Sequence, residues 1–190
     1  MRKPDYDWNA YFHGNPLQKW WKRKIATIVM EMVGTANPVL EVGAGSSPLL
    51  SMLPVKEKVG LDIDLAKVKF MQKKDLSSKY YCEKGEDTGF PDGSCSVVMC
   101  LEVLEHHPRP YHLVRELARV TMVGGKVIIA TPNFASMKWN VLELVYGLMS
   151  RSGYHEEHDS RFTESAVIAL ADSVGSVSYT HLTLPTILLV

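Results

Sequence analysis

The stretch VLEVGAGSS (39–47) decides the fold of this chain. Residues 39–42 form a short apolar run of strand length, and Gly43 and Gly45 follow it directly. Glycines at these positions permit a tight turn from a strand into a helix, with the backbone open to close approach by a ligand. The turn lacks the third glycine of the GxGxxG fingerprint, so the turn alone does not identify which ligand it binds, and the rest of the chain is needed to do so.

Four more apolar runs follow along the chain. They are VGLDI (59–63), KYYCE (79–83), SVVMCLE (96–102) and KVIIATP (126–132). Apolar residues at helical spacing predict helices over 15–33 and 111–121. Strands that alternate with helices of this length build βαβ units with a parallel sheet and right-handed crossovers. We therefore predict an α/β fold with a Rossmann-like, doubly wound, mostly parallel sheet.

The composition is that of an ordinary globular domain. The chain has 190 residues, 46% of them hydrophobic, and its 21 basic and 21 acidic residues leave a formal net charge of zero. Nucleic-acid binders usually carry a basic excess, so no nucleic-acid partner is expected. The one basic run, KWWKRK (19–24), is interpreted as the solvated stripe of a helix.

Sequence features also indicate the cellular compartment of the protein. The N-terminus has no signal-peptide pattern, and no stretch reaches the roughly 18 apolar residues that a membrane span needs. The three cysteines lack metal-site spacing and fit buried free thiols. These features predict a cytoplasmic protein.

The last segment, residues 177–190, differs in character from the rest. VSYTHLTLPT (177–186) is the translation of GTC TCT TAT ACA CAT CTG ACG CTG CCG ACG, which resembles a transposon adapter used in preparing sequencing libraries. We therefore expect native sequence to stop near Ser176 and 177–190 to be a non-native, adapter-derived tail. The alternative is an ordinary apolar strand.

Doubly wound sheets bind ligands beyond the carboxyl ends of their strands, where the strand order reverses. The second apolar run ends in LDID, which places Asp62 17 residues after Gly45. A carboxylate there can accept hydrogen bonds from both hydroxyls of a ribose. The glycine turn and Asp62, on successive strands, together predict a ligand that contains adenosine.

Four segments resemble, in order and spacing, the class I S-adenosylmethionine-dependent methyltransferases of the type-11 kind. They are VLEVGAGSS, GLDID, GEDTGFPDGSCSVVMCLEVLEH and ELARVTMVGGKVIIATPN, and the resemblance covers residues 36–175. With it we predict strand order 3-2-1-4-5, with the terminal strands missing or replaced. An N-terminal lid or helix (1–35) would precede an S-adenosylmethionine-binding methyltransferase domain (36–176).

The resemblance also implies roles for individual residues. The turn after the first strand would hold the methionine part of the cofactor, with Glu41 near its ammonium. Asp62 would take the ribose hydroxyls, and the backbone at Leu101 would line the sulfonium site. Lys84 replaces the usual aspartate of the third-strand motif, so the adenine contact falls to Glu86 or to backbone. The cofactor-binding residues predicted in this way are Glu41, Gly43, Ala44, Gly45, Asp62, Ile63, Glu86 and Leu101.

The stretch CLEVLEHHPRP (100–110) carries a cluster of glutamates and histidines. If a helical turn begins as the fourth strand ends, Glu102, Glu105 and His106 share one face, and His158 is a candidate fourth ligand. The cluster resembles that of ubiquinone-pathway O-methyltransferases and small-RNA 3′-terminal ribose methyltransferases, where it is associated with a divalent cation. This set suits Mg²⁺, Mn²⁺ or Zn²⁺.

Two other interpretations of the cluster stay open. In many relatives of this type the same LEH phrase occurs without a metal: the glutamate caps local backbone and the histidine, here His106, faces the substrate as a catalytic base. The cluster can also be purely structural. His107, beside Pro108, is expected to be exposed.

The function predicted is methyl transfer from S-adenosylmethionine to an oxygen of a small phenolic, quinone-like or glycan acceptor. One alternative is RNA ribose 2′-O-methylation with a divalent metal, which the neutral charge disfavours. Another is a non-catalytic S-adenosylmethionine-binding module or an inactive fragment. An apolar stripe within 137–154 predicts either a lid, peripheral membrane contact, or a helix packed on its own domain.

Overall fold

The computed structural model describes residues 3–133, 162–175, 180–184 and 186–189. Its helices are α1 (Tyr6–Phe12), α2 (Pro16–Val33), α3 (Leu49–Met52), α4 (Leu65–Lys74), the short 3-10 helix η1 (Leu104–His106), α5 (Pro110–Val120) and α7 (Glu164–Asp172). Its strands are β1 (Val39–Val42), β2 (Lys58–Asp62), β3 (Lys79–Cys82), β4 (Cys95–Leu101), β5 (Thr121–Pro132), β6 (Thr180–Leu184) and β7 (Thr186–Leu189). Within these ranges no helix has the length and apolar character to cross a membrane.

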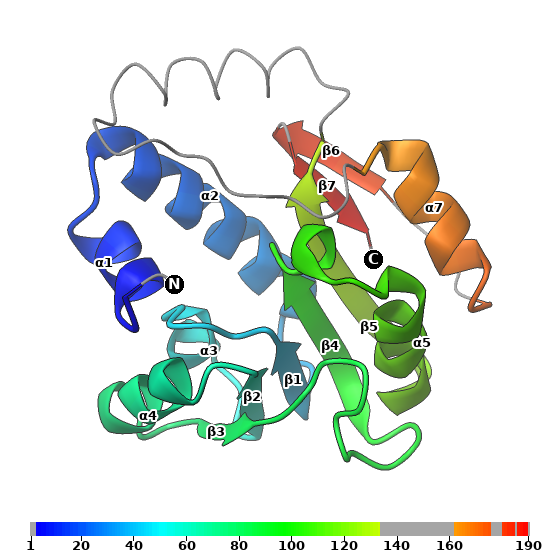
Figure 1. Cartoon of the computed structure of the whole chain (residues 1–190), viewed down its shortest axis with the longest axis horizontal. Coiled ribbons are helices and arrows are strands. Elements are labelled where there is room, and N and C mark those ends of the chain that lie inside the picture. The colour runs from blue at the N-terminus through cyan, green and yellow to red at the C-terminus, as the bar shows by residue number, and fades with distance from the viewer. Residues whose placement is uncertain (1–2, 134–161, 176–179, 185, 190) are drawn as a thin grey trace.

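The strands form one sheet in the order β3-β2-β1-β4-β5-β7-β6. The five strands from β3 to β5 are parallel to their neighbours, which confirms the predicted order 3-2-1-4-5. β7 pairs antiparallel with both β5 and β6. The last two strands come from the segment expected to be adapter-derived, and they take the positions beside β5 where terminal strands were expected to be missing or replaced (Figure 1).

Helices cover both faces of the sheet (Figure 1). Successive side chains of a strand point to opposite faces, and in β4 this alternation separates two cores. Val97 and Met99 pack in a cluster with α2, α3 and α4, whereas Val98 and Cys100 pack in a cluster with α5 and α7. All four side chains are fully buried. The continuous apolar run of β4 is therefore that of a central parallel strand with helices on both sides.

The N-terminal helices are positioned by a well-formed start of α2. The Asn15 side chain accepts a hydrogen bond from the Gln18 amide at 2.9 Å, and the Gln18 side chain accepts one from the Asn15 amide at 3.1 Å. This reciprocal capping box, with Pro16 at the first helical position, fixes where α2 begins. α1 packs beside α2, and the two helices lie next to the carboxyl ends of the parallel strands (Figure 1).

Candidate active site

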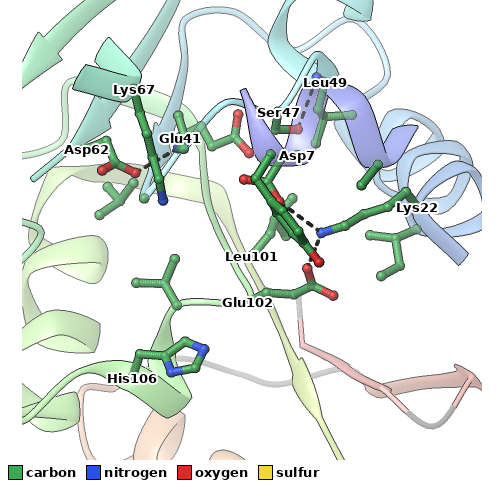
Figure 2. Close-up of a pocket in the computed structure, with 18 of the residues that line it drawn as sticks. Asp7, Lys22, Glu41, Ser47, Leu49, Asp62, Lys67, Leu101, Glu102 and His106 are labelled. Carbon is green, nitrogen blue, oxygen red and sulfur yellow. Dashed lines mark hydrogen bonds and ion pairs between the residues drawn. The ribbon is translucent and has the colours of Figure 1, made fainter. Parts of the chain in front are cut away.

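A cavity of about 490 Å³ lies at the carboxyl ends of β1, β2 and β4, with α1 and α2 along its outer side (Figure 2). It is the location that a doubly wound sheet provides for a ligand. Every predicted site residue that the structure describes lies in its lining. These residues are Glu41, Gly43, Ala44, Gly45, Asp62, Ile63, Glu86, Leu101, Glu102, Glu105 and His106.

The glycine turn after β1 is held against the end of β2. The amides of Gly43 and Ala44 both donate to the Leu61 carbonyl at 2.8 Å. Gly43 has φ of 76°, and a Cβ there would come within 2.2 Å of Val103 Cγ2. Only glycine fits such a position, because it has no Cβ and adopts positive φ without strain. The backbone therefore forms one wall of the cavity directly.

Glu41 is a buried carboxyl group with an unused oxygen. Its residue is 2% exposed, and Oε2 has no hydrogen-bond partner among the described residues. Burial, together with the carboxylates of Asp7 and Asp62, raises the pKa of Glu41 to about 8, although the ammonium of Lys22 acts in the opposite direction. A buried polar atom without a partner is costly, so this oxygen is suited to bind a donor group, and a cationic donor best.

Asp62, the last residue of β2, holds two loop amides. Its Oδ2 accepts from the Gly45 amide and its Oδ1 from the Asp64 amide, both at 2.8 Å. Each carboxylate oxygen has a second lone pair, so two further donors can bind. Ile63 follows at the rim of the cavity and is 73% exposed, which leaves a large apolar surface available to a flat ligand.

Glu86 also lines the cavity and is bound to the loop after β4. The Arg109 amide donates to His107 Nδ1 at 3.1 Å, so the ring proton is on Nε2, which donates to Glu86 Oε2 at 2.8 Å. Arg109 also donates to Glu86 Oε1 at 2.7 Å. The hydrogen bond from His107, together with Arg109, lowers the pKa of Glu86 to about 2 despite some desolvation. The expectation that His107 is exposed was wrong, because this contact leaves only 13% of its side chain accessible.

The expected helical face of Glu102, Glu105 and His106 does not form. No helix begins at Glu102, which has φ of 57° and is followed by the short η1. Trp21 Nε1 donates to Glu102 Oε1 at 3.2 Å, and Lys22 Nζ donates to Oε2 at 2.5 Å. Desolvation alone would raise the pKa of Glu102, but Lys22 outweighs it and the net pKa is lowered.

The other members of the cluster are placed differently. Glu105 is 1% exposed and accepts a hydrogen bond from the Thr131 hydroxyl at 3.0 Å. Its burial, with Glu102 nearby, raises its pKa to about 7. His106 is exposed and lines the cavity. His158 and the stripe of 137–154 lie outside the described residues.

The described members of the cluster do not by themselves form a metal site, and the predicted fourth ligand, His158, lies outside the described residues. In the part of the chain that the structure describes, no group of three or more His, Cys, Asp and Glu residues is arranged to hold one. The carboxylate of Glu102 is already neutralised by Lys22. The described residues place an exposed histidine, His106, in the lining of a cavity that also contains the carboxyl groups of Glu41 and Asp62.

Sequence reasoning predicted an N-terminal lid or helix over 1–35 but missed the side chains of α1 and α2 that line the cavity. Asp7, Trp21 and Lys22 line the cavity, and Lys22 is within 3.4 Å of Asp7 Oδ1 (Figure 2). The interpretation of KWWKRK as a solvated stripe was therefore wrong for Lys22, although Arg23 and Lys24 are exposed as expected. The sequence held a weak signal for this placement of Lys22. Gln18 and Lys22 lie one helical turn apart beside the apolar stripe of the helix, so their side chains share a face next to that stripe.

Comparisons with known proteins find similarity to methyltransferases. A family described as a methyltransferase domain matches residues 40–129. A ubiquinone biosynthesis O-methyltransferase of Coxiella burnetii (strain Dugway 5J108-111) is 24% identical over 185 residues, which cover 88% of this chain and 79% of that protein. Its counterpart in Chromobacterium violaceum is 34% identical over 102 residues, covering 50% of this chain and 44% of that protein.

Solved structures share the fold at low identity. The magnesium protoporphyrin IX methyltransferase of Synechocystis PCC 6803, solved with bound SAH, has a TM-score of 0.74 at 16% identity and covers 98% of this chain and 95% of its own. A carbon methyltransferase, CurJ, has a TM-score of 0.68 at 15% identity and covers 95% of this chain and 56% of its own. Since proteins with such different acceptors share one fold, the fold does not identify the acceptor.

Proposed function

The chain belongs to the class I S-adenosylmethionine-dependent methyltransferases, and on this premise we propose that it methylates an oxygen of a small phenolic, quinone-like or glycan acceptor. The observation that carries the proposal is that a single cavity is lined both by the Glu41 and Asp62 carboxyl groups and by His106. This shared lining supports a cofactor site and an acceptor base in the same cavity. The O-methyltransferase relatives support oxygen as the atom that receives the methyl group.

The residues present fit the cofactor. The unpartnered Oε2 of Glu41 is suited to its ammonium, and the free lone pairs of Asp62 to its two ribose hydroxyls. Ile63 offers an apolar surface at the adenine end, and Leu101 lies in the cavity lining beyond the glycine turn. When bound, the cofactor supplies an electrophilic methyl group on a sulfonium.

His106 is the residue proposed to handle the acceptor proton. Its ring projects from η1 towards the cavity, on the far side from Lys67 and Asp62 (Figure 2). The acceptor oxygen attacks the methyl carbon, the electron pair of the breaking carbon–sulfur bond stays on sulfur, and the hydroxyl proton passes to the imidazole. In-line transfer of this kind depends mainly on the position of the two reactants, with a base adding to the rate.

The proposal is tested by methyl transfer from labelled S-adenosylmethionine to a panel of catechols, phenols and small glycans, with a short RNA duplex as an additional acceptor. We expect a methyl ether to form on a small hydroxyl compound and the rate to survive a metal chelator. Methylation of the RNA alone, or a rate that requires Mg²⁺, Mn²⁺ or Zn²⁺, contradicts the proposal. Cofactor binding without transfer to any acceptor supports a non-catalytic module instead.

The affinity for cofactor should depend on pH through Glu41. With a pKa of about 8 in the free protein, this carboxyl is mostly neutral at pH 6–7. It has to ionise to pair with an ammonium, so cofactor binding releases a proton and affinity rises with pH. We expect the affinity for the cofactor to rise about tenfold from pH 6 to pH 7. In this range an α-amino group with a pKa of about 7.7–8.0 stays mostly charged, so the change comes from Glu41.

Calorimetry in buffers of different ionisation enthalpy measures both the affinity and the released proton. The charged residues that act on Glu41 are Asp7 from α1, Lys22 from α2 and Asp62 from β2. Glu41→Gln should flatten the dependence, whereas Glu31→Gln, an exposed site on α2, should leave it as in the wild type. An affinity that is independent of pH in the wild type would show that Glu41 does not bind the ammonium.

A further inference from the structure

Glu102 has a backbone conformation that its residue type disfavours. Its φ of 57° is the only positive value at a non-glycine position among the residues that the structure describes. A Cβ atom makes this region unfavourable for every residue except glycine. Glu102 lies between Leu101, which ends β4, and η1, which carries His106. The placement of both residues in the cavity wall therefore depends on this one turn.

A conformation of this kind persists only where surrounding contacts fix it. The Glu102 amide donates to the Ala130 carbonyl at 2.7 Å. Each oxygen of its carboxylate is held by a different residue of α2, one by Trp21 Nε1 and the other by Lys22 Nζ. Because α2 lies 80 positions earlier in the chain, tertiary contact, and not local sequence, fixes the turn.

Lys22 also contacts the other side of the cavity. Its Nζ lies 3.4 Å from Asp7 Oδ1 on α1, and the Asp7 amide donates to the Ser46 hydroxyl at 3.0 Å. Ser46 directly follows the glycine turn after β1 and is fully buried. One ammonium group thus connects α1, α2 and the turn after β4, and through Asp7 it reaches the turn after β1 (Figure 2).

We propose that Lys22 is a positioning residue for methyl transfer. By binding the carboxylate of Glu102, it keeps the turn after β4 in its left-handed conformation and so directs His106 towards the acceptor. The inference rests on the proposed function for the role of His106. The state of the turn itself can be measured without any turnover.

The first test compares Lys22→Met with Lys24→Met, an equal change of charge at an exposed position of the same helix. Hydrogen exchange by mass spectrometry reports on the amides of Glu102 and His106, which donate to Ala130 and Val103. In the cofactor-bound protein, Lys22→Met should speed their exchange about tenfold and lower kcat about tenfold. Lys24→Met should change neither the exchange rates nor kcat. Lys22→Arg keeps the positive charge, so its exchange rates and kcat should stay close to those of the wild type. Melting temperatures confirm that each variant is folded.

The decisive test removes the need for support at the turn. Glycine adopts a φ of +57° without a Cβ penalty, so Glu102→Gly should keep the turn without help from α2. In that background, adding Lys22→Met should alter exchange and kcat by less than about twofold. If Lys22→Met changes exchange and kcat tenfold both in the wild type and in Glu102→Gly, the proposal is overturned, because Lys22 would then act without the turn at residue 102.

Three more outcomes bear on the proposal. If Glu102→Gly abolishes turnover while its exchange pattern stays native, the carboxylate itself acts on the substrate and the proposal fails. If the wild type methylates no acceptor, the proposed function fails, but the exchange measurements still settle what Lys22 does. Unchanged exchange in Lys22→Met would refute the positioning role, whatever the activity.

Discussion

Replacing His106 by Asn lowers kcat about 100-fold or more, because removal of a positioned general base typically costs a factor of about 100 to 10,000. Asparagine is close to histidine in size and polarity but cannot take up the hydroxyl proton of the acceptor. The cofactor affinity should stay the same, since Glu41 and Asp62 form a separate part of the lining. Single-turnover kinetics with a saturating acceptor, combined with calorimetry on S-adenosylmethionine, separate the two effects.

The control for this prediction is His112→Asn. His112 is an exposed histidine on α5, outside the cavity lining, so its loss should leave kcat unchanged. A fall of less than about threefold in His106→Asn, well under what a general base usually contributes, would mean that the proton goes elsewhere. Glu105 is then the next candidate, because it lines the same cavity and its pKa is raised to about 7 by burial.

Asp62→Ala should weaken S-adenosylmethionine binding by at least about 100-fold, a loss of ~2.7 kcal/mol or more. Two hydrogen bonds from ribose hydroxyls to a charged acceptor are expected to contribute about 1.5–3 kcal/mol each. The variant also loses the acceptor that holds the Gly45 amide at 2.8 Å, so the glycine turn becomes less well ordered. Calorimetry at pH 7.5 gives the affinity directly and does not require a known acceptor.

Asp64→Ala is the matched control, since it removes a carboxylate two residues away. Asp64 accepts a hydrogen bond from the Ala66 amide at 2.9 Å and caps α4. Its loss should cost about 1 kcal/mol of the free energy of unfolding and little affinity for the cofactor. Equal affinity in Asp62→Ala and in the wild type would remove Asp62 from the ribose site.

The parallel sheet could be predicted from sequence because its signals are local. The run 39–42 coincides with β1, and the predicted helix 15–33 differs from α2 (Pro16–Val33) by one residue at its start. Each of these segments combines a hydrophobic period with glycine or proline at its ends, which is enough to fix its type. β5 begins at Thr121, five residues before the predicted run, because its first part is exposed and lacks an apolar pattern.

The walls of the cavity were less predictable, since they depend on contacts between distant segments. The positive φ of Glu102 follows from contacts with α2, which no window of sequence around residue 102 contains. The same is true of His107, whose partner Glu86 lies 21 positions earlier. A spacing of i, i+3 and i+4 predicts one face only where a helix has formed, and the turn at Glu102 prevents one from starting there.

The pairing of β7 with β5 has a consequence for the choice of sample. Because β7 comes from the segment expected to be adapter-derived, a sample cut near Ser176 would leave the hydrogen-bonding edge of β5 without this neighbour. Within the described ranges, every residue that lines the cavity lies at or before Pro132, so such a sample would keep the described lining. An open strand edge pairs readily with other chains, so the shortened sample should aggregate more than the full chain even though its described cavity lining is unchanged.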